Sequence, residues 1–372
     1  MGVHTMARVT LQTIADKVGV SRMTVSNAFS RPDQLSATLR ATILAAADEL
    51  GYAGPDPAAR ALARGSTGAV GIVLTDSAVT AFTDEVASRF FGAIAGELAP
   101  TGLALTLVPA VELEGRVPAR DVAMDAALVY HCDPDSPALS WLQKRGLPTV
   151  LVDQFPVDGI ASVNVADRDG ARAAAQHLVD LGHRHVGIVT FTVHEPHGIT
   201  QSTPLGTEGY GARERMIGWL DALNAAGVST TAFRTRDSVD GGDAALVALL
   251  RADPLITAVL CFSDVMAANV LFAAQDRGIA VPEQLSVVGF DDTPFASRVR
   301  PALTTVRQDV PEKGRLAAAA VIALLERGST DEVLPAERTV LPTELVIRDS
   351  TAGPRTTPAE LIIAPGMGTG GR

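Results

Sequence analysis

The sequence has few aromatic residues, only two cysteines and no long run of hydrophobic residues. Aromatics make up 4% of the 372 residues, whereas hydrophobic residues together make up 47%, ample for a large buried core. Cys132 and Cys261 each lie within an apolar run, so we expect buried free thiols in a reducing compartment rather than a disulfide. Because no stretch of 18 apolar residues and no apolar N-terminal segment is present, we expect a cytoplasmic protein without a membrane span.

Positive charge is also scarce, and it is unevenly distributed. The chain carries 31 Lys and Arg against 42 Asp and Glu, for a net charge of −11. Residues 1–65 hold seven basic and five acidic side chains, and the rest of the chain holds 24 basic and 37 acidic ones. A weakly basic head on an acidic body predicts that the head, and not the body, contacts phosphates. The small excess of positive charge in the head also predicts that a single copy binds weakly.

Residues 9–29 predict two short helices around a tight turn. The apolar face of the first helix holds Leu11, Ile14, Ala15 and Val18. Gly19 permits the left-handed turn that ends this helix, and Ser21 can cap the next one. The second helix is expected to bury Val25 and Phe29. Its outward face then carries Arg22, Met23, Thr24, Ser26 and Asn27.

Small hydroxyls together with Arg and Asn suit phosphate oxygens and base edges, so the outward face predicts binding in the DNA major groove. The alternative is an ordinary helical hairpin with a solvated polar face. These residues resemble the helix-turn-helix of the LacI family, and the match continues through 34–40 and 50–52 as the start and end of a third helix. The resemblance implies that Thr24, Ser26 and Ser36 fix the head on phosphates. Arg22, Met23 and Asn27 would face bases, with Met23 limited to apolar contact.

Residues 55–66 read as a linker that contains a short helix. Pro55 and Pro57 stop the preceding helix, and Pro57 suits a first helical position. The simple interpretation is a plain interdomain linker. The family resemblance implies instead a hinge helix that orders on DNA, with Leu62 as a wedge between base pairs in the minor groove. The full set of residues predicted to contact DNA is Leu11, Gln12, Ser21, Arg22, Met23, Thr24, Ser26, Asn27, Ser36, Tyr52, Ala59, Arg60 and Leu62.

From residue 67 onward, short apolar runs alternate with amphipathic stretches. The expected strands are 70–74, 103–108, 126–130, 149–152, 186–190, 257–262 and 286–290. The expected helices lie around 84–99, 136–145, 168–182, 208–226, 241–251, 263–277 and 310–327. This alternation predicts parallel, doubly wound sheets, and so many units favour two lobes with a ligand cleft at the carboxyl ends of the strands.

This body is similar to the family's effector domain, which resembles periplasmic sugar-binding proteins. Its most specific markers are 181–186, 281–283, 288–292 and 301–308. We therefore expect an all-α three-helix helix-turn-helix head over 8–54 and an α/β two-lobed effector and dimerisation domain over 67–348. The resemblance implies chain crossings between lobes near 165, 292 and 330. Residues 349–372, rich in Gly, Pro and Thr, are expected to form a disordered tail.

Effector binding is assigned first to Arg215 and Asp264, which match positions where the family grips its ligand. An Arg fork and a carboxylate can together hold vicinal hydroxyls or a base edge, although the two could also simply pair with each other. The further wall residues are Asp76, Phe82, Asp84, Asp153, Trp219, Phe290 and Asp291. Each of these has a structural interpretation of equal weight, and Asp291 could serve only as a cap or a crossing residue.

Other signals are set aside. His194 and His197 lack the spacing of a helical metal motif, and Pro196 breaks any helix there, so no metal or cofactor is expected. The Gly-rich run 366–372 has no following helix that could cradle a phosphate. No catalytic triad or dyad follows from spacing, and no apolar heptads close the chain, so a dimer without enzymatic activity is expected.

These observations together predict a homodimeric repressor that binds near-palindromic double-stranded operator DNA. A small-molecule effector, with a carbohydrate or polyol favoured, would switch this binding. The alternative is a corepressor-dependent repressor or an activator that responds to a nucleoside or purine. A solute-binding protein would need an export signal and no DNA-binding head, and an enzyme would need a catalytic constellation.

Overall fold

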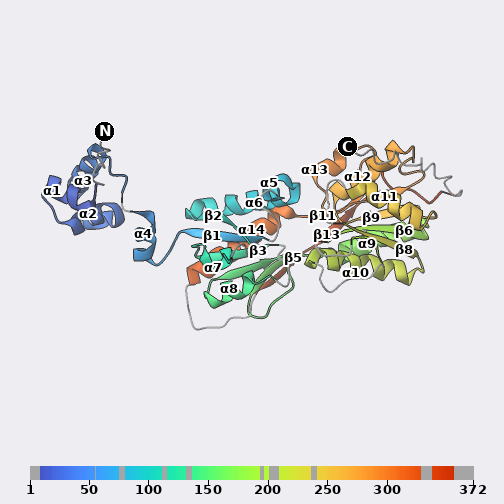
Figure 1. The fold of residues 1–372 in the computed structure, drawn as a ribbon, viewed down its shortest axis with the longest axis horizontal. Helices are drawn as coiled ribbons and strands as arrows, with labels where there is room; N and C mark the ends of the chain where they lie inside the picture. The colour runs from blue at the N-terminus through green and yellow to red at the C-terminus, as the bar shows by residue number, and fades with distance from the viewer. Residues whose placement is uncertain are drawn as a thin grey trace. The chain divides into compact units, whose positions relative to one another are not determined.

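The computed structural model describes residues 9–54, 56–74, 80–110, 115–130, 136–192, 197–200, 209–235, 241–327 and 337–355. The chain divides into two compact units, one over residues 1–68 and one over residues 69–372. Figure 1 shows a small helical unit and a larger α/β unit built around two sheets. Each unit is described separately below.

The first unit is a three-helix head closed by a small aliphatic core. Its helices are α1 (Leu11–Val18), α2 (Arg22–Ser30) and α3 (Ala37–Glu49), with a short 3₁₀ turn at Pro32–Gln34. Ile14, Val25 and Ile43, one from each helix, are fully buried against one another. Gly19 ends α1 with a φ of 77°, a left-handed conformation that glycine adopts without steric cost. The two expected helices and the turn between them are confirmed.

A fourth helix, α4 (Pro57–Arg64), follows the head. Asp56 caps it, because the carboxylate accepts bonds from the amides of Ala58 (2.8 Å) and Ala59 (3.3 Å). Gly65 ends it with a φ of 70°. In its described part α4 has no buried side chain, so this helix contributes nothing to the core of the head.

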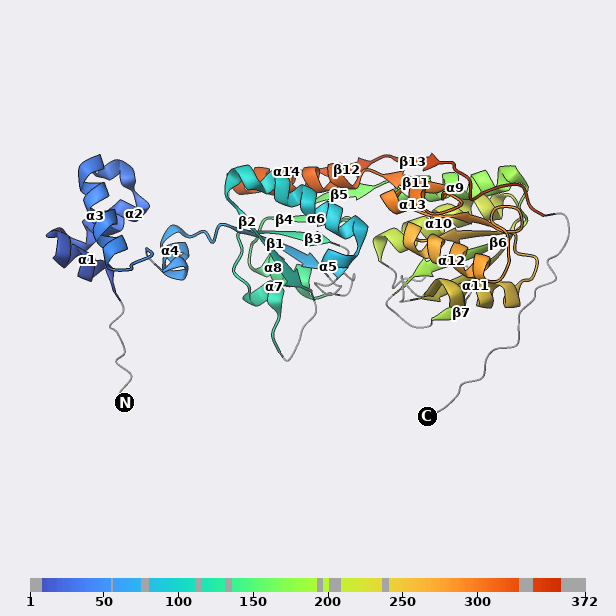
Figure 2. The ribbon, with the colours of Figure 1, turned by 90° about the horizontal axis from the view of Figure 1, so that it is seen from above.

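The second unit has two lobes, and lobe 1 is built on a six-stranded parallel sheet. The strand order is β12 (Arg338–Leu341), β5 (Ala161–Val165), β4 (Thr149–Val152), β3 (Ala126–Tyr130), β1 (Ala69–Leu74) and β2 (Ala104–Pro109). One face packs on α6 (Glu85–Leu98) and α14 (Val310–Arg327), which lie side by side in Figure 2. The other face packs on α7 (Pro118–Asp121) and α8 (Ala138–Lys144). The short α5 (Thr80–Thr83) precedes α6.

Lobe 2 is built on a five-stranded sheet. The strand order is β10 (Ser286–Val288), β9 (Ala258–Cys261), β6 (His185–Phe191), β8 (Ser229–Thr235) and β7 (Gly198–Thr200), with only β7 antiparallel. One face is covered by α9 (Asp167–Leu181) and α10 (Tyr210–Ala225). The other is covered by α11 (Gly241–Ala252) and α12 (Asp264–Asp276), with α13 (Pro294–Arg298) beside α12. The expected fold class, two parallel doubly wound lobes after a helical head, is confirmed.

The chain passes between the lobes at three places. It leaves lobe 1 between β5 and α9, close to the expected position of 165. It returns after β11 (Thr305–Gln308), which leads directly into α14, so the expected crossing near 292 is wrong. It leaves again between β12 and β13 (Thr343–Val346), so the crossing near 330 is wrong as well. Because β11 and β13 pair as a small antiparallel sheet, these last two crossings run together as a hydrogen-bonded ribbon.

The expected disordered tail is wrong for residues 349–355. Ser350 is fully buried, and its hydroxyl donates to the carbonyl of Val287 (2.6 Å) and accepts from the amide of Thr304 (2.8 Å). The Val287 amide donates to the Ser350 carbonyl (2.9 Å), so this segment continues the edge of sheet 2 beside β10. The Gly- and Pro-rich composition conceals a run of residues that supplies backbone partners to that edge.

Two further sequence expectations concern cysteines and membranes. Cys261 is a buried free thiol, and burial raises the pKa of that thiol. Cys132 lies outside the described residues. Among the described helices, none combines the length and the apolar composition that a bilayer crossing requires.

Candidate functional site

The exposed face of α2 is the first candidate site. Ser21 caps the helix by accepting from the Thr24 amide (3.0 Å), and the two hydroxyls lie 2.8 Å apart. These bonds fix the first turn, with Arg22 and Met23 exposed at its start and the Met23 side chain 69% accessible. Val25 and Ala28 anchor the opposite side of the helix in the core. A helix held by its inner face while its first turn points outward can enter a DNA groove.

Two neighbouring polar groups are held beside this face. The Asn27 amide donates to the Gln34 side chain (3.1 Å), which links α2 to the 3₁₀ turn. Ser36 caps α3 by accepting from the Leu39 amide (3.3 Å) and remains exposed. Hydroxyls at exposed helix N-termini lie next to unsatisfied backbone N–H groups, where a phosphate is bound most readily.

The exposed face of α4 is the second feature. Leu62 is 86% accessible, the largest value among the exposed large hydrophobic side chains of the described chain, and Ala59 beside it on the helix is also exposed. An exposed leucine on a capped helix has no role in the core of its own unit. It is free to insert into an apolar or stacked environment supplied by a partner.

The third feature lies where the carboxyl ends of the strands of both lobes converge. We use the name interlobe cluster for six polar side chains found there: Asp153, Asp167, Arg215, Asp291, Gln308 and Lys313. All six are buried. Asp153 follows β4, and Lys313 lies on α14, so both belong to lobe 1. Asp167 begins α9, Arg215 lies on α10, and Asp291 follows β10, so these three belong to lobe 2.

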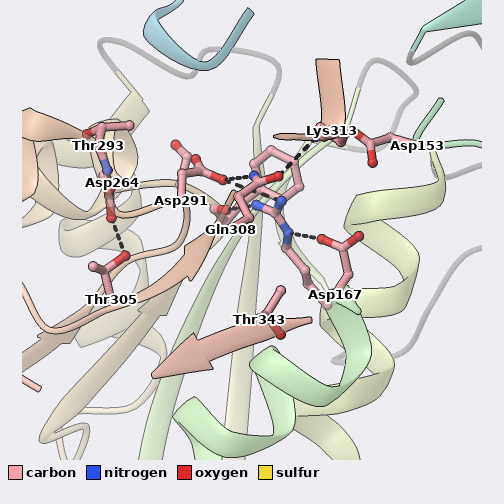
Figure 3. Close-up of polar contacts among 12 residues, drawn as sticks. Asp153, Asp167, Asp264, Asp291, Thr293, Thr305, Gln308, Lys313 and Thr343 are labelled. Carbon is pink, nitrogen blue, oxygen red and sulfur yellow. Dashed lines mark hydrogen bonds and ion pairs between the residues drawn. The ribbon is translucent and has the colours of Figure 1, made fainter. Parts of the chain in front are cut away.

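The cluster forms a continuous path between the lobes (Figure 3). Lys313 Nζ contacts Asp153 Oδ2 (2.5 Å) and donates to Gln308 Oε1 (3.0 Å). Gln308 Nε2 donates to Asp291 Oδ1 (2.7 Å), and that oxygen lies 3.5 Å from Arg215 NH2. Arg215 Nε donates to Asp167 Oδ1 (2.8 Å). Because Gln308 ends the crossing strand β11, the path follows the chain from lobe 2 to lobe 1.

Arg215 is held in place by two aromatic rings. Its guanidinium carbon lies 3.6 Å from the ring centroid of Phe290 and 4.5 Å from that of Phe262. A further bond runs from NH1 to the Phe262 carbonyl (2.5 Å). Stacking fixes the plane of the fork, so its donors are preorganised for oxygen acceptors.

Burial and neighbouring charge shift the protonation of this region. Burial raises the pKa of Asp291 to about 8, and the negative charge of Asp264 adds to that shift while Arg215 opposes it. Burial also raises the pKa of the Tyr130 phenol, at the end of β3 in lobe 1. The charges of Asp153, Asp84 and Asp291 raise the same pKa further, so groups from both lobes converge on this phenol.

The backbone at two of the carboxylates is strained. Asp153 has a φ of 50° and Asp291 a φ of 110°, in the region that non-glycine residues rarely adopt. Asp292, the next residue, also has a φ of 50°. Such conformations cost of order 1–3 kcal/mol each and are found mainly at functional sites. Their position at strand ends in the cluster supports a binding role.

Arg215 and Asp264 were expected to hold the effector together, with direct pairing of the two as the alternative, but the structure gives them different partners. Asp264 is fully buried at the start of α12, and its two carboxylate oxygens accept bonds from the Thr293 amide (2.7 Å) and the Thr305 hydroxyl (2.5 Å). Figure 3 shows Asp264 beside these threonines, whereas the ion pairs of the Arg215 guanidinium are with Asp167 and Asp291. Gly289 makes room for Asp264, since a Cβ there would lie 2.4 Å from Asp264 Oδ1. Asp264 therefore supports the strand ends from behind.

The remaining expected wall residues divide into several groups. Trp219 is 1% exposed inside the core of lobe 2, so its assignment as a wall residue is wrong. Phe82 is 74% exposed on α5. Asp84 caps α6 by accepting from the Ala87 amide (2.7 Å). Phe290 is buried and contacts the cluster through the Arg215 stack. Asp76 lies outside the described residues, as does His194.

Sequence reasoning missed three members of the cluster. Lys313 interrupts the apolar stripe of α14, between Val310 and Ala317. A lysine on the apolar face of a helix was the one feature of the sequence that could have indicated a functional role for it. Asp167 opens a helix directly after β5, a strand that was not expected. Gln308 gave no signal of its own within the family marker 301–308.

Comparison with known proteins gives two family matches. Residues 10–54 match the model described as bacterial regulatory proteins, lacI family. Residues 175–351 match a periplasmic binding protein-like domain. An HTH-type transcriptional regulator of Mycolicibacterium smegmatis is 38% identical over 371 residues, which cover 94% of this chain and 98% of the relative. A second such regulator, from Mycobacterium tuberculosis, is 38% identical over 361 residues, covering 93% and 98%.

Solved structures show the same similarity. The lac repressor dimer bound to operator and the anti-inducer ONPF aligns with a TM-score of 0.72 and 25% identity, covering 93% of this chain and all of that one. The complex of the transcriptional regulator CelR with cellobiose aligns with a TM-score of 0.64 and 25% identity, covering 92% and 100%.

Proposed function

Because this chain belongs to the LacI family of bacterial regulatory proteins and is a DNA-binding transcriptional regulator, we propose that it is a homodimeric repressor of metabolic genes. Its hold on a near-palindromic operator would be switched by a small molecule, a sugar or related polyol, bound between the two lobes. One observation carries the proposal above the others. A single chain joins a helix with an exposed polar first turn to a body whose lobes share a buried, charged cluster.

The head supplies sequence reading. Arg22 can donate a bidentate pair to guanine, Asn27 can pair with adenine, and Met23 can contact a thymine methyl. Thr24, Ser26 and Ser36 would bind phosphates and fix the register. Since one head carries little net positive charge, two copies on two half-sites are needed for a tight complex.

The hinge helix supplies bending. Two α4 helices in the minor groove would each direct Leu62 toward the central base step, with Ala59 and Arg60 against the groove. Unstacking a step costs a few kcal/mol, and this cost is offset because bent DNA wraps a larger area of protein surface. Binding then depends on the spacing of the two hinges, and this dependence allows the body to control it.

The interlobe cluster supplies effector recognition. Arg215 presents donors and Asp291 presents acceptors within 3.5 Å of each other, an arrangement that matches vicinal hydroxyls, which both accept and donate. Because the cluster is buried and hydrogen-bonded to itself, the lobes must part for a ligand to exchange these bonds for its own. Two structural relatives carry cellobiose and ONPF, which favours a carbohydrate.

Coupling between the two sites follows from lobe movement. A ligand that prefers one arrangement of the lobes would change the distance between the first strands of two paired bodies, and hence between their hinges. Such coupling is reciprocal, so an inducer must bind less tightly to the DNA complex than to the free dimer.

The test begins with selection of duplexes from a random pool by the purified full-length chain, followed by sedimentation to establish the oligomeric state. Fluorescence anisotropy with the selected duplex is then repeated with metabolites that raise the melting temperature. We expect a dimer, a marked preference over random competitor at moderate salt, and release by at least one polyol. A monomer, or equal binding of random DNA, rejects the proposal. Tighter DNA binding with ligand would identify a corepressor.

A further inference from the structure

Lys313 is a lysine in a position that the sequence and packing make suitable for an apolar residue. It lies on the buried stripe of α14, where Val310, Ala317 and Val321 are all fully buried. Its side chain is 1% exposed, and Nζ lies 5.8 Å from the ring centroid of Phe90. A buried ion pair rarely stabilises a fold more than well-packed apolar groups of the same volume. The pair with Asp153 therefore calls for a role other than stability.

The charges around the pair restrict what a ligand can carry. Within the interlobe cluster, Asp153, Asp167 and Asp291 face only two cations, Arg215 and Lys313, and each cation already contacts a carboxylate. Burial, together with the charges of Asp264 and Asp84, raises the pKa of Asp291, so this region already disfavours negative charge. A phosphate or carboxylate bound here would need a cation to neutralise it, but Arg215 and Lys313 are both already paired with aspartates of the cluster.

Resting on the effector role proposed above, we propose that the Lys313–Asp153 pair acts as a charge filter in the effector site. Asp153 forms an ion pair with Lys313, so the ammonium group of Lys313 is not available to bind an anion. Together the two side chains offer one donor and one acceptor to ligand hydroxyls. The site then accepts hydroxyl-rich ligands without phosphate or carboxylate groups and rejects their anionic counterparts. Lys313 and Asp153 are specificity residues on lobe 1, opposite Arg215 and Asp291 on lobe 2.

The experiment uses matched ligand sets. D-glucose, D-ribose, inositol and cellobiose are each paired with a phosphorylated counterpart. Dissociation constants for the full-length protein are measured by calorimetry, after thermal-shift screening. For the best neutral binder we expect the phosphate ester to bind at least about 100-fold more weakly. An ester that binds as tightly as its neutral partner overturns the filter, as does a panel in which no neutral member binds.

Asp153→Asn is the decisive variant, since Asn tolerates the positive φ of this position and keeps the side-chain shape. It frees the Lys313 charge, so the preference for neutral ligand over ester should fall by about tenfold or more. Asp158→Asn is the matched control, because it removes the same charge from the same lobe at a fully exposed aspartate that pairs with the half-exposed Arg338, and it should leave the preference unchanged.

The double variant Asp153→Asn, Lys313→Met removes the cation as well and should restore rejection of the ester. An unchanged preference in folded Asp153→Asn, or a tolerance for esters that persists in the double variant, overturns the assignment. Operator affinity is measured on each preparation without ligand. Its retention separates a failed filter from a failure of the regulatory function itself.

Discussion

Asp291 and Asp292 are adjacent acidic residues with opposite surroundings. The Asp291 carboxylate is turned into the interlobe cluster, beside Gln308 and Arg215. That of Asp292 is turned to Arg307 (2.7 Å) and Arg348 (2.5 Å), where it ties β11 to the segment after β13. Both have positive φ, which Asp and Asn tolerate better than other side chains. Asp291 therefore belongs to the proposed binding site. Its neighbour Asp292 makes only structural ion pairs, so the same substitution at Asp292 serves as a control.

Asp291→Asn should weaken effector binding by about 10- to 100-fold at pH 9, where the Asp291 carboxylate with its pKa of about 8 is ionised, because a charge-assisted hydrogen bond is worth about 1.5–3 kcal/mol. Asp292→Asn should change that affinity by less than about threefold, since it only loosens pairs that are partly exposed. Calorimetry with the effector found by screening measures both variants. Equal losses would place the ligand elsewhere, and unchanged operator affinity confirms that both variants are folded.

Stability should fall as the pH rises. Burial raises the pKa of Asp291 to about 8 and that of Asp264 to about 7, whereas unfolded aspartates titrate near 3.9. Between these limits the folded chain holds more protons than the unfolded chain, so each group favours the folded state at low pH. This contribution disappears as the pH rises through the folded pKa. The slope is at most about 1.4 kcal/mol per pH unit for each group.

Urea unfolding at pH 6 and pH 9 provides the measurement. The Asp264→Asn variant should lose less stability between these two pH values than the unmodified chain. A variant with the same loss would show that Asp264 is not protonated in the folded state near neutral pH.

The binding role of an individual residue was predictable from the sequence where a charged residue lies at or near the end of a recognisable strand. Asp153, Arg215 and Asp291 follow or face recognisable strands, and the sequence indicated all three. Trp219 misled because an aromatic residue beside Arg215 on a helix can face either the ligand or the core, and only packing decides. Asp264 was assigned to the ligand wall for a related reason, because it follows the end of a strand. Its carboxylate instead bonds to Thr293 and Thr305 behind the strand ends.

Elements were more predictable than residues, since hydrophobic periodicity determines them. Every long helix from α6 to α14 lies where the amphipathic pattern indicated. The strands β5 and β8 were missed because polar residues interrupt them, as in Ser-Val-Asn within 161–165 and Thr-Thr-Ala within 229–235. Missing β12 and β13 displaced two of the crossings, because chain order alone does not reveal which sheet a short strand joins.

The hinge helix gives a prediction about DNA bending. Leu62→Ala should lower operator affinity by about 10- to 100-fold, because burying a leucine side chain is worth about 1.5–3 kcal/mol, and it should reduce the bend. Leu62→Met keeps a large apolar side chain and should retain most of both. Energy transfer across an end-labelled operator measures the bend. A full bend with alanine at this position would exclude the wedge.

The α9–α10 contact gives a prediction about stability. A Cβ on Gly218 would lie 2.2 Å from the Arg168 carbonyl oxygen, so Gly218→Ala must push the helices apart, at a cost of about 1–3 kcal/mol. Gly96 in α6 has nothing within 4 Å of the same position, so Gly96→Ala should instead stabilise by about 0.5–1 kcal/mol. Opposite shifts in the denaturation midpoint confirm the difference, and equal shifts contradict the close contact.

At the scale of the whole molecule, the two-part organisation was predictable and its carboxyl boundary was not. The change from short helices to alternating strands and helices placed the start of the body at residue 67, two residues from the observed start of the second unit at residue 69. The composition of 349–372 indicated a tail, yet Ser350 and Ala352 complete lobe 2 through bonds to β10. Turn-forming residues in an extended segment at a sheet edge produce no hydrophobic pattern in the sequence. Their structural role is therefore visible only from their hydrogen bonds to the neighbouring strand.

Truncation tests this boundary. A chain that ends at residue 348 loses the Ser350 bonds and the Arg355 contact to the Gln284 carbonyl (2.7 Å). Since each unsatisfied buried group costs about 1–3 kcal/mol, we expect a loss of several kcal/mol or aggregation. The matched control ends at residue 355 and retains all of these bonds. Circular dichroism melts compare the two, and equal melting temperatures would show that the segment is dispensable.

Strand β12, which borders β5 at the edge of sheet 1, comes from near the end of the chain. During translation, lobe 1 thus remains incomplete on the ribosome until residues 338–341 have been made, well after the rest of its sheet, with the outer edge of β5 open to chaperones or to aggregation. A prematurely terminated product would release a finished N-terminal head but neither finished lobe. The cell cannot obtain a half-working sensor from such a gene.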